Sequence, residues 1–152
     1  MITVTPISNL AEGTIVTLNE SGSPVEFYIA KHNYELELNV EPRTLLVRKN
    51  CYDARQWHTS KVDAYASSTI DTWLNNEYKT FLDSNIQEAI GSTYFYYTPG
   101  EGSYTVKTLS RSIFILSLTE IGLTASYANI EGAALPISNL LKIAYLNDTA
   151  TI

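Results

Sequence analysis

The sequence contains one cysteine among its 152 residues, Cys51. A single cysteine cannot form a disulfide within the chain or build a zinc site from thiolates. We therefore interpret Cys51 as a small hydrophobic side chain of the interior. Histidine is almost as rare, since His32 and His58 are the only two, and neither has a His, Asp or Glu at metal-ligand spacing. We expect no metal site and no cofactor.

Catalytic motifs are also missing. The chain has neither a G-x-S-x-G elbow nor an S-x-x-K motif. Asp71 and Glu77 fall within a predicted helix, where the helix dipole and solvent account for them. The Gly100-Glu101-Gly102 stretch follows a proline turn between predicted strands, and no helix follows it, so it does not match a phosphate-binding loop. We expect no catalytic residues, and we predict that the protein is not an enzyme.

Positive charge is scarce. Ten Lys and Arg stand against sixteen Asp and Glu, which gives a net charge of −6. Nucleic-acid binding draws its affinity from clustered basic side chains, so this composition argues against a nucleic-acid partner. Charged residues make up 17% of the chain, whereas tyrosine occurs eleven times. A polar surface with many flat side chains is typical of contacts with protein or sugar.

Long apolar runs are absent as well. No window approaches the roughly 20 apolar residues of a membrane span, and the N-terminal residues lack the basic start and apolar run of a secretory signal. We expect that the protein does not insert into a membrane. We expect it to be made in a host cytoplasm and to leave the cell by lysis or within a particle. With 45% apolar residues, the chain is long enough for one domain over residues 1–152.

The segment 68–82 carries the clearest helix signal. Ser68 is a good N-cap, and Asp71 stands where a capping box needs its acid. Apolar residues then recur at steps of three and four, which predicts one amphipathic helix with its polar residues on the solvent side. A shorter helix is predicted over 85–90, with Gly91 as a left-handed cap. Further helical turns are predicted at 52–56 and 118–122, and a brief helix followed by an extended piece is predicted within 136–146.

Apolar alternation and turn residues predict several β-strands. Two of them flank a Ser- and Gly-rich turn and form a hairpin, while 33–43 reads as a loop. A Pro-Gly turn predicts a second hairpin, and the most β-branched run predicts a central strand. In chain order the predicted strands are 13–18, 25–32, 44–48, 94–97, 103–107 and 112–117.

Four consecutive aromatic residues, from Tyr94 to Tyr97, form the most distinctive cluster. Alternation in a strand places Tyr94 and Tyr96 on one face, and Phe95 and Tyr97 on the other. One pair is then in the core and the other is exposed or at an interface, so the run is either core with a partly buried edge or a platform for sugar or protein. The candidate contacts are Tyr94, Tyr96, Tyr97 and Tyr104. Both tryptophans are expected in the interior.

Three segments carry a resemblance that extends from end to end. They are the helix around Trp73-Leu74-Asn75, the segment 43–48 (RTLLVR) and the segment 114–120 (FILSLTE). In these the chain resembles a domain family of unknown function found in phages and prophages of Gram-positive gut bacteria. Members look like relatives of the C-type-lectin and formylglycine-generating-enzyme-like fold, and they resemble virion tail or fibre components. No catalytic residue set comes with the resemblance.

The resemblance implies that family members are longer than this sequence. Relatives continue beyond the position of Thr149, so the sequence resembles their N-terminal two-thirds. Either the domain is a shortened form whose open sheet is completed by another chain, or it closes differently from its relatives. An open sheet edge favours pairing with a neighbour, so we expect homo-oligomers or assembly with other virion proteins.

Together these observations predict an α+β fold of the C-type-lectin-like type, with a twisted, mainly antiparallel sheet covered by the two helices. The expected function is that of a virion structural protein, a tail, fibre or decoration component that contacts host-surface glycan or protein. The alternative is a stand-alone carbohydrate- or protein-binding module of a bacterial surface or secreted system. An enzyme on the formylglycine-generating scaffold is disfavoured because Cys51 has no second cysteine.

Overall fold

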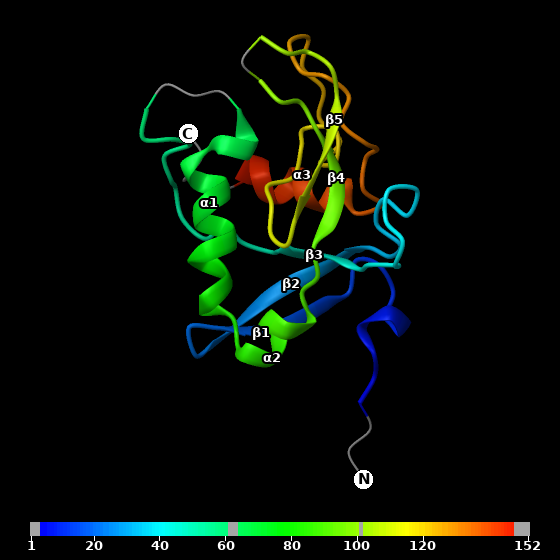
Figure 1. Ribbon diagram of the computed structural model, residues 1–152. Helices are drawn as coiled ribbons and strands as arrows, with labels where there is room; N and C mark the ends of the chain where they lie inside the picture. Colours follow the sequence, from blue (N-terminus) through cyan, green and yellow to red (C-terminus); the bar gives the residue numbers. More distant parts are fainter. Residues whose placement is uncertain (1–3, 61–63, 101, 148–152) are drawn as a thin grey trace.

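The computed structural model describes residues 4–60, 64–100 and 102–147, and it has the predicted α+β fold. The strands form two antiparallel sheets, one of order β1-β2-β3 and one of β4-β5. Figure 1 shows the three-stranded sheet in the lower half of the molecule, with helix α1 on one side above it and the β4-β5 hairpin on the other. The sequence predicted a single sheet, so the division into two is a correction.

The first hairpin forms where the sequence predicts it. β1 (Ile15–Glu20) pairs with β2 (Ser23–Lys31), and Ser21 and Gly22 turn the chain with φ angles of 51° and 77°. β3 (Leu45–Arg48) pairs with the other edge of β2, which confirms the third predicted strand. Residues 33–43 form turns without regular structure, as expected.

The second hairpin is confirmed in its first arm and displaced in its second. β4 (Thr93–Tyr97) pairs with β5 (Lys107–Arg111), whereas the predicted strand was 103–107. The glycines of the Pro-Gly segment explain the displacement, because Gly100 and Gly102 have φ angles of 80° and 81°. Such angles suit a tight turn and not a strand, so the chain needs more residues before pairing begins.

The predicted central strand at 112–117 is wrong. No strand forms over these residues, although Phe114 and Leu116 pack against the core. The side chain of Asn75 supplies the backbone bonds instead: its Nδ2 donates to the Ile113 carbonyl at 2.9 Å, and its Oδ1 accepts from the N–H groups of Ser112 and Ile113, each at 3.2 Å. At Ser112 and Ile113, the Asn75 amide therefore makes the backbone hydrogen bonds that a neighbouring strand would otherwise make.

The long predicted helix divides into two parts. α1 (Thr69–Asn76) is an α-helix, and a 3-10 helix, η3 (Tyr78–Phe81), follows it. The Ser68 cap is confirmed, since its Oγ accepts the Asp71 N–H at 3.2 Å. The capping box is not confirmed. It requires the Asp71 side chain to accept the Ser68 N–H, but this N–H donates to the Tyr65 carbonyl.

The helix prediction at 85–90 is confirmed by α2 (Ser84–Ala89). Gly91, however, is not among the glycines with positive φ, so it is not a left-handed cap. Its lack of a side chain serves another contact, since a Cβ on Gly91 would lie 2.3 Å from Cζ of Arg43. Glycine here leaves room for a guanidinium group.

The remaining helical predictions have mixed outcomes. Residues 52–56 are irregular, and the helical turn lies instead at η2 (Tyr65–Ser67). The turn at 118–122 is confirmed, with Gly122 at φ 73°. α3 (Ser138–Asn147) is longer than predicted and leaves no extended piece before residue 148. A short 3-10 helix, η1 (Ile7–Asn9), precedes the first hairpin.

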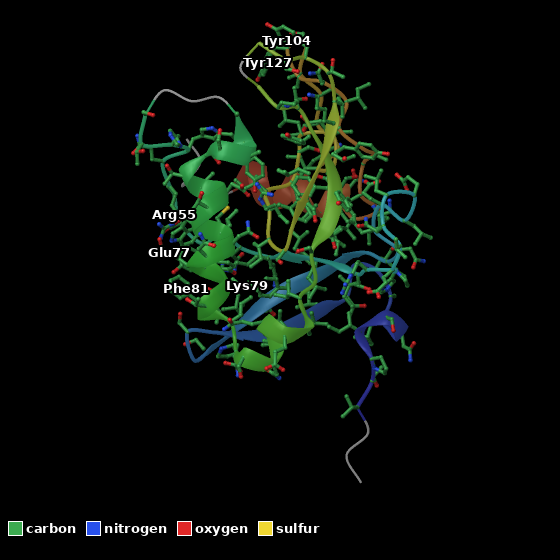
Figure 2. The ribbon with its side chains drawn as sticks, in the orientation of Figure 1. Arg55, Glu77, Lys79, Phe81, Tyr104 and Tyr127 are labelled. Carbon is green, nitrogen blue, oxygen red and sulfur yellow. The ribbon has the colours of Figure 1, made fainter. Side chains whose placement is uncertain are left out.

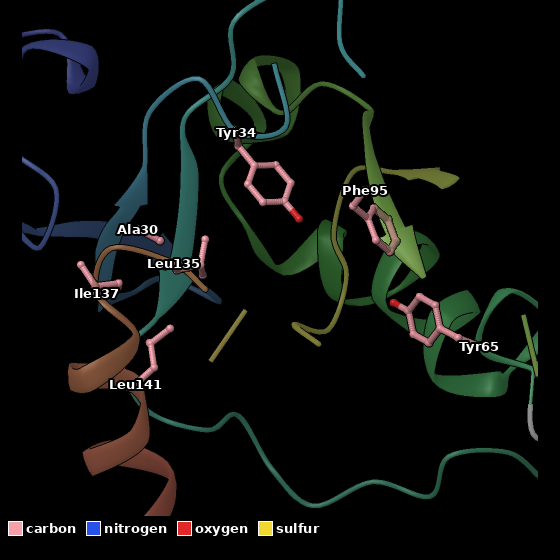
Figure 3. Packing of buried hydrophobic residues seen from close by; sticks show 7 residues of the cluster. All are labelled: Ala30, Tyr34, Tyr65, Phe95, Leu135, Ile137 and Leu141. Carbon is pink, nitrogen blue, oxygen red and sulfur yellow. The ribbon is translucent and has the colours of Figure 1, made fainter. Parts of the chain in front are cut away.

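Both sheets and α3 contribute to one hydrophobic core. Phe95 stacks on Phe114 at a centroid distance of 4.1 Å, and Phe114 stacks on Tyr34 at 5.8 Å. Figure 3 shows Tyr34 and Phe95 in the same cluster as Ala30 of β2 and Leu141 of α3. The buried members are Ala30, Tyr34, Tyr65, Phe95, Leu135, Ile137 and Leu141.

Two predictions about single residues of the interior are wrong. Trp73 is buried as expected, but Trp57 is 41% exposed and Cys51 is exposed. Both exposed residues lie in the irregular stretch before η2, outside the described helices and strands. Trp57 keeps one ring contact, with Tyr65 at 5.7 Å.

Two polar residues of α1, Asp71 and Asn75, face the protein and not the solvent. Asp71 is 3% exposed, and both of its carboxylate oxygens accept from Nε of Arg111 on β5, at 2.9 and 3.0 Å. Nη2 of Arg111 reaches the same carboxylate at 2.9 Å and donates to the Ala66 carbonyl at 3.3 Å. With Asn75, this ion pair joins α1 to the second hairpin. Glu77 on the same helix is exposed, as predicted.

We predict that Asp71→Asn lowers the free energy of unfolding by about 2–4 kcal/mol, because it leaves the Arg111 charge without its partner in a largely buried place. Chemical denaturation followed by circular dichroism measures the change. The matched control is Glu77→Gln, which removes an exposed carboxylate from the same helix and should alter stability by less than about 0.5 kcal/mol. Equal stability of the two variants would contradict the structural role of the pair.

Candidate recognition site

A hollow of about 310 Å³ opens where the loop after β4 meets the loop before α3. The first loop contributes Thr98, Ser103 and Tyr104, and the second contributes Tyr127, Asn129 and Glu131. In Figure 1 both loops lie at the end of the molecule opposite the N-terminus. The hollow is built from polar groups and aromatic rings, a composition that suits a polar ligand with apolar faces.

Hydrogen bonds hold the two loops together. The Thr98 N–H donates to Oε1 of Glu131 at 2.7 Å, and Nδ2 of Asn129 donates to Oγ1 of Thr98 at 3.2 Å. Behind them, the Glu131 backbone binds the side chains of Thr119 and Ser117 at 3.1 and 3.2 Å. The floor of the hollow is thus fixed to the 118–122 turn.

Two tyrosines stand out from this fixed floor. Tyr104 is 80% exposed and Tyr127 is 88% exposed. Figure 2 shows both at the same end of the molecule, one from each loop. Large aromatic side chains that remain exposed beside a hollow are typical of binding surfaces, because their apolar area stays in contact with water until a ligand covers it.

The structure separates the four tyrosines that the sequence singled out. Alternation along β4 is confirmed: Tyr94 is 49% exposed, while Phe95 is 3% exposed. Tyr96 lies on the outer face with its hydroxyl 3.3 Å from Glu37, and Tyr97 packs against the core. Tyr104 lines the hollow, whereas the other three are not among its lining residues.

Three lining residues escaped the sequence analysis. Tyr127, Asn129 and Glu131 belong to a stretch without hydrophobic period, which gave no sign of its position in the fold. An aromatic residue next to polar residues in such an aperiodic stretch was the available signal. Its partner loop lies more than twenty residues earlier in the chain, so the pairing itself required the structure.

A pair of carboxyl groups lies next to the second loop. A Cβ on Gly132 would be 3.0 Å from Oε1 of Glu35, so the absence of a side chain at Gly132 leaves space for this carboxyl group. Burial, and after it a hydrogen bond with Glu37, raise the pKa of Glu35 to about 7. The same bond lowers the pKa of Glu37. Near pH 6, protonated Glu35 therefore donates to ionised Glu37.

Two more buried carboxylates have partners within the protein. Glu120 accepts the hydroxyl of Tyr34 and the N–H of Ser117, the latter at 2.8 Å, while burial raises its pKa. Glu20 accepts Nε and Nη2 of Arg48 at 3.1 and 3.0 Å and the hydroxyl of Tyr78 at 2.5 Å. Each joins separate segments of the chain, which is a structural role.

Both histidines make hydrogen bonds within the protein. The His32 ring lies 2.7 Å from the Leu10 carbonyl and 2.9 Å from Oγ1 of Thr44. Nδ1 of His58 accepts the Thr69 N–H at 2.9 Å. Within the described ranges, no group of three or more His, Cys, Asp or Glu side chains is placed to hold a metal ion. In the same part of the chain, no helix has the length and apolarity that crossing a membrane requires.

The fold and the site define an α+β domain with a loop-built surface hollow. The family model described as "Domain of unknown function (DUF6273)" matches residues 41–151, and the chain belongs to this family. This confirms the predicted membership of a family of unknown function. The matched region includes both loops of the hollow, while the first hairpin precedes it. No curated protein and no solved structure matches the chain.

We predict that stability falls between about pH 5 and pH 7 through Glu35. Its pKa is near 7 in the folded state and 4.5 ordinarily, so over this interval the folded state keeps a proton that the unfolded state loses. The decline should reach about 1–2 kcal/mol and level off above about pH 7. Glu37 acts only at lower pH, because its pKa is lowered.

Denaturation midpoints at several pH values measure this decline. Glu35→Gln cannot titrate and should make the decline less steep, leaving the part that comes from Glu120, whereas Glu88→Gln, at an exposed position of α2, should keep the whole decline. An unchanged slope in Glu35→Gln would show that Glu35 does not hold a proton in the folded state.

Proposed function

We propose that the chain is a recognition domain of a phage or prophage virion, a tail, fibre or decoration component that contacts host-surface glycan through the hollow between Tyr104 and Tyr127. The observation that carries the glycan contact is the pair of almost fully exposed tyrosines beside a hollow with fixed polar groups. The virion assignment is supported by the sequence resemblance around Trp73, 43–48 and 114–120.

The chemistry of the hollow suits a sugar. A sugar ring has an apolar face that stacks on an aromatic ring, and hydroxyl groups that bond in the plane of the ring. The rings of Tyr104 and Tyr127 supply the stacking surfaces. Ser103, Asn129 and Glu131 supply donors and acceptors at positions that the loop bonds fix.

Binding without catalysis remains our expectation. Hydrolysis of a glycosidic bond ordinarily uses two carboxyl groups on either side of the bond. Among the described residues that line the hollow, Glu131 is the one acid. The domain would therefore hold a glycan and leave it intact.

Assembly is the second part of the proposal, and the sheet edges limit how it occurs. The outer edge of β4 is covered at Tyr94, where the Asn39 amide donates to the carbonyl at 3.2 Å and accepts the N–H at 2.9 Å. The end of β1 is covered too, since the Ser21 N–H donates to the Phe81 carbonyl. We infer that homo-oligomers, or contacts with other virion proteins, use β1 from Ile15 to Leu18, where Ile15 is 42% exposed.

The alternative is a stand-alone carbohydrate- or protein-binding module of a bacterial surface or secreted system. It would use the same hollow, whose polar groups and exposed tyrosines suit a carbohydrate or a protein. The C-type-lectin-like scaffold agrees with a site built by loops, and it remains a prediction from the resemblance. Solution mass by light scattering distinguishes the two, because a virion component should form a stable oligomer and a free module should be monomeric.

We predict that Tyr104→Ala and Tyr127→Ala each weaken glycan binding about tenfold, since a stacking ring contributes roughly 1–2 kcal/mol. The measurement is fluorescence on a printed array of bacterial cell-wall and surface glycans, with thermal unfolding as the check of fold. Tyr94→Ala is the matched control, because Tyr94 is exposed but lies outside the hollow. Loss of binding in Tyr94→Ala alone would place the contact on the outer face of β4 and contradict the proposal.

A further inference from the structure

Among the described residues that line the hollow, charge has one sign. Among the described lining residues there is one carboxylate, Glu131, and no Lys or Arg. Two further carboxyl groups lie close behind the second loop, Glu120 near Glu131 and Glu35 against Gly132. Burial raises the pKa of both, which favours their neutral forms, so the negative charge at the hollow is that of Glu131. A ligand in the hollow therefore meets negative charge without a cation among the residues that line it.

The Glu131 carboxylate is held in place. Its Oε1 accepts the Thr98 N–H at 2.7 Å, while its backbone is bound to Thr119 and Ser117. A carboxylate has about four acceptor sites, so this one bond leaves capacity for a donor on a ligand. Because the group is half-buried and bonded to the Thr98 N–H, turning away from a ligand of like charge would break that bond.

We infer that the hollow selects glycans made of neutral or amino-bearing sugars and excludes sugars with acid groups, with Glu131 as the residue that sets this specificity. The inference rests on the proposed glycan contact and adds the class of sugar. A hydroxyl or ammonium group donates to Glu131, and an ammonium group also gains from the aromatic faces of Tyr104 and Tyr127. A uronic acid, sialic acid or phosphate group meets the fixed negative charge instead, and such a like-charge contact is how binding sites reject wrong ligands.

An array that carries the same glycan backbones in neutral, amino-bearing and acid-bearing forms tests the inference on the full chain. We expect the neutral and amino-bearing forms to bind at least tenfold more strongly than their acid-bearing partners. Glu131→Gln should reduce this preference to less than about threefold, because the amide removes the charge while its oxygen still accepts the Thr98 N–H. Glu88→Gln, which removes an equal charge far from the hollow in sequence, should keep the wild-type preference.

The outcomes separate the two proposals. Binding without preference, or a preference for acid-bearing forms, overturns the charge selection and leaves the glycan contact standing. Preference that survives in Glu131→Gln overturns the role of this residue. Absence of binding to every form overturns the proposed glycan contact and the inference with it.

Discussion

The ion pair between Asp71 and Arg111 is the contact on which the arrangement of this protein depends. A two-stranded hairpin alone is marginally stable in water, so β4-β5 needs a partner that fixes it. Helix α1 provides one through Asp71, which is 3% exposed. A buried carboxylate is tolerated only with its counter-charge in place, so α1 and β5 cannot separate without a large penalty. The first loop of the hollow follows β4 directly and takes its position from this hairpin, and the second loop is bonded to the first through Thr98.

Buried acidic side chains join separate segments of the chain at two other places. Glu20 joins β1 to Arg48 of β3 and to Tyr78 of η3, and Glu120 joins the 118–122 turn to Tyr34. In each case a buried acid connects segments that are far apart in the sequence. These contacts supplement a hydrophobic core to which both small sheets contribute. The first hairpin precedes the region matched by the family model. It is nevertheless part of the same packing, because Ala30 of β2 lies in the common core.

Local signals predicted the elements whose structure is decided locally. The first hairpin follows from its Ser-Gly turn, and the start of α1 follows from the Ser68 cap. The run 112–117 has the composition of a strand, yet the partner that decides its structure is a single side chain, Asn75, nearly forty residues earlier. Asp71 was misplaced for a similar reason, since periodicity assigns polar residues to solvent and cannot reveal a buried arginine on a later strand.

The candidate site could not be predicted in full for the same reason, because it depends on contacts between distant segments. Tyr104 was singled out because tyrosines gather in that part of the sequence, and so were Tyr94, Tyr96 and Tyr97, which lie on β4 and are not among the lining residues of the hollow. Tyr127 was missed because nothing in an aperiodic stretch shows that it meets the loop of Tyr104. Binding surfaces made of loops depend on contacts between distant segments, so composition identifies the kind of residue and only the fold identifies which ones.

The central claim is that recognition takes place between Tyr104 and Tyr127. Its most direct test is an NMR titration of the tyrosine-labelled chain with the glycan that binds most strongly on the array, in which the ring signals of the eleven tyrosines are followed separately. The account predicts that the signals of Tyr104 and Tyr127 shift in a saturable way while those of Tyr94 and Tyr96 stay unchanged. Shifts confined to Tyr94 and Tyr96 would contradict it.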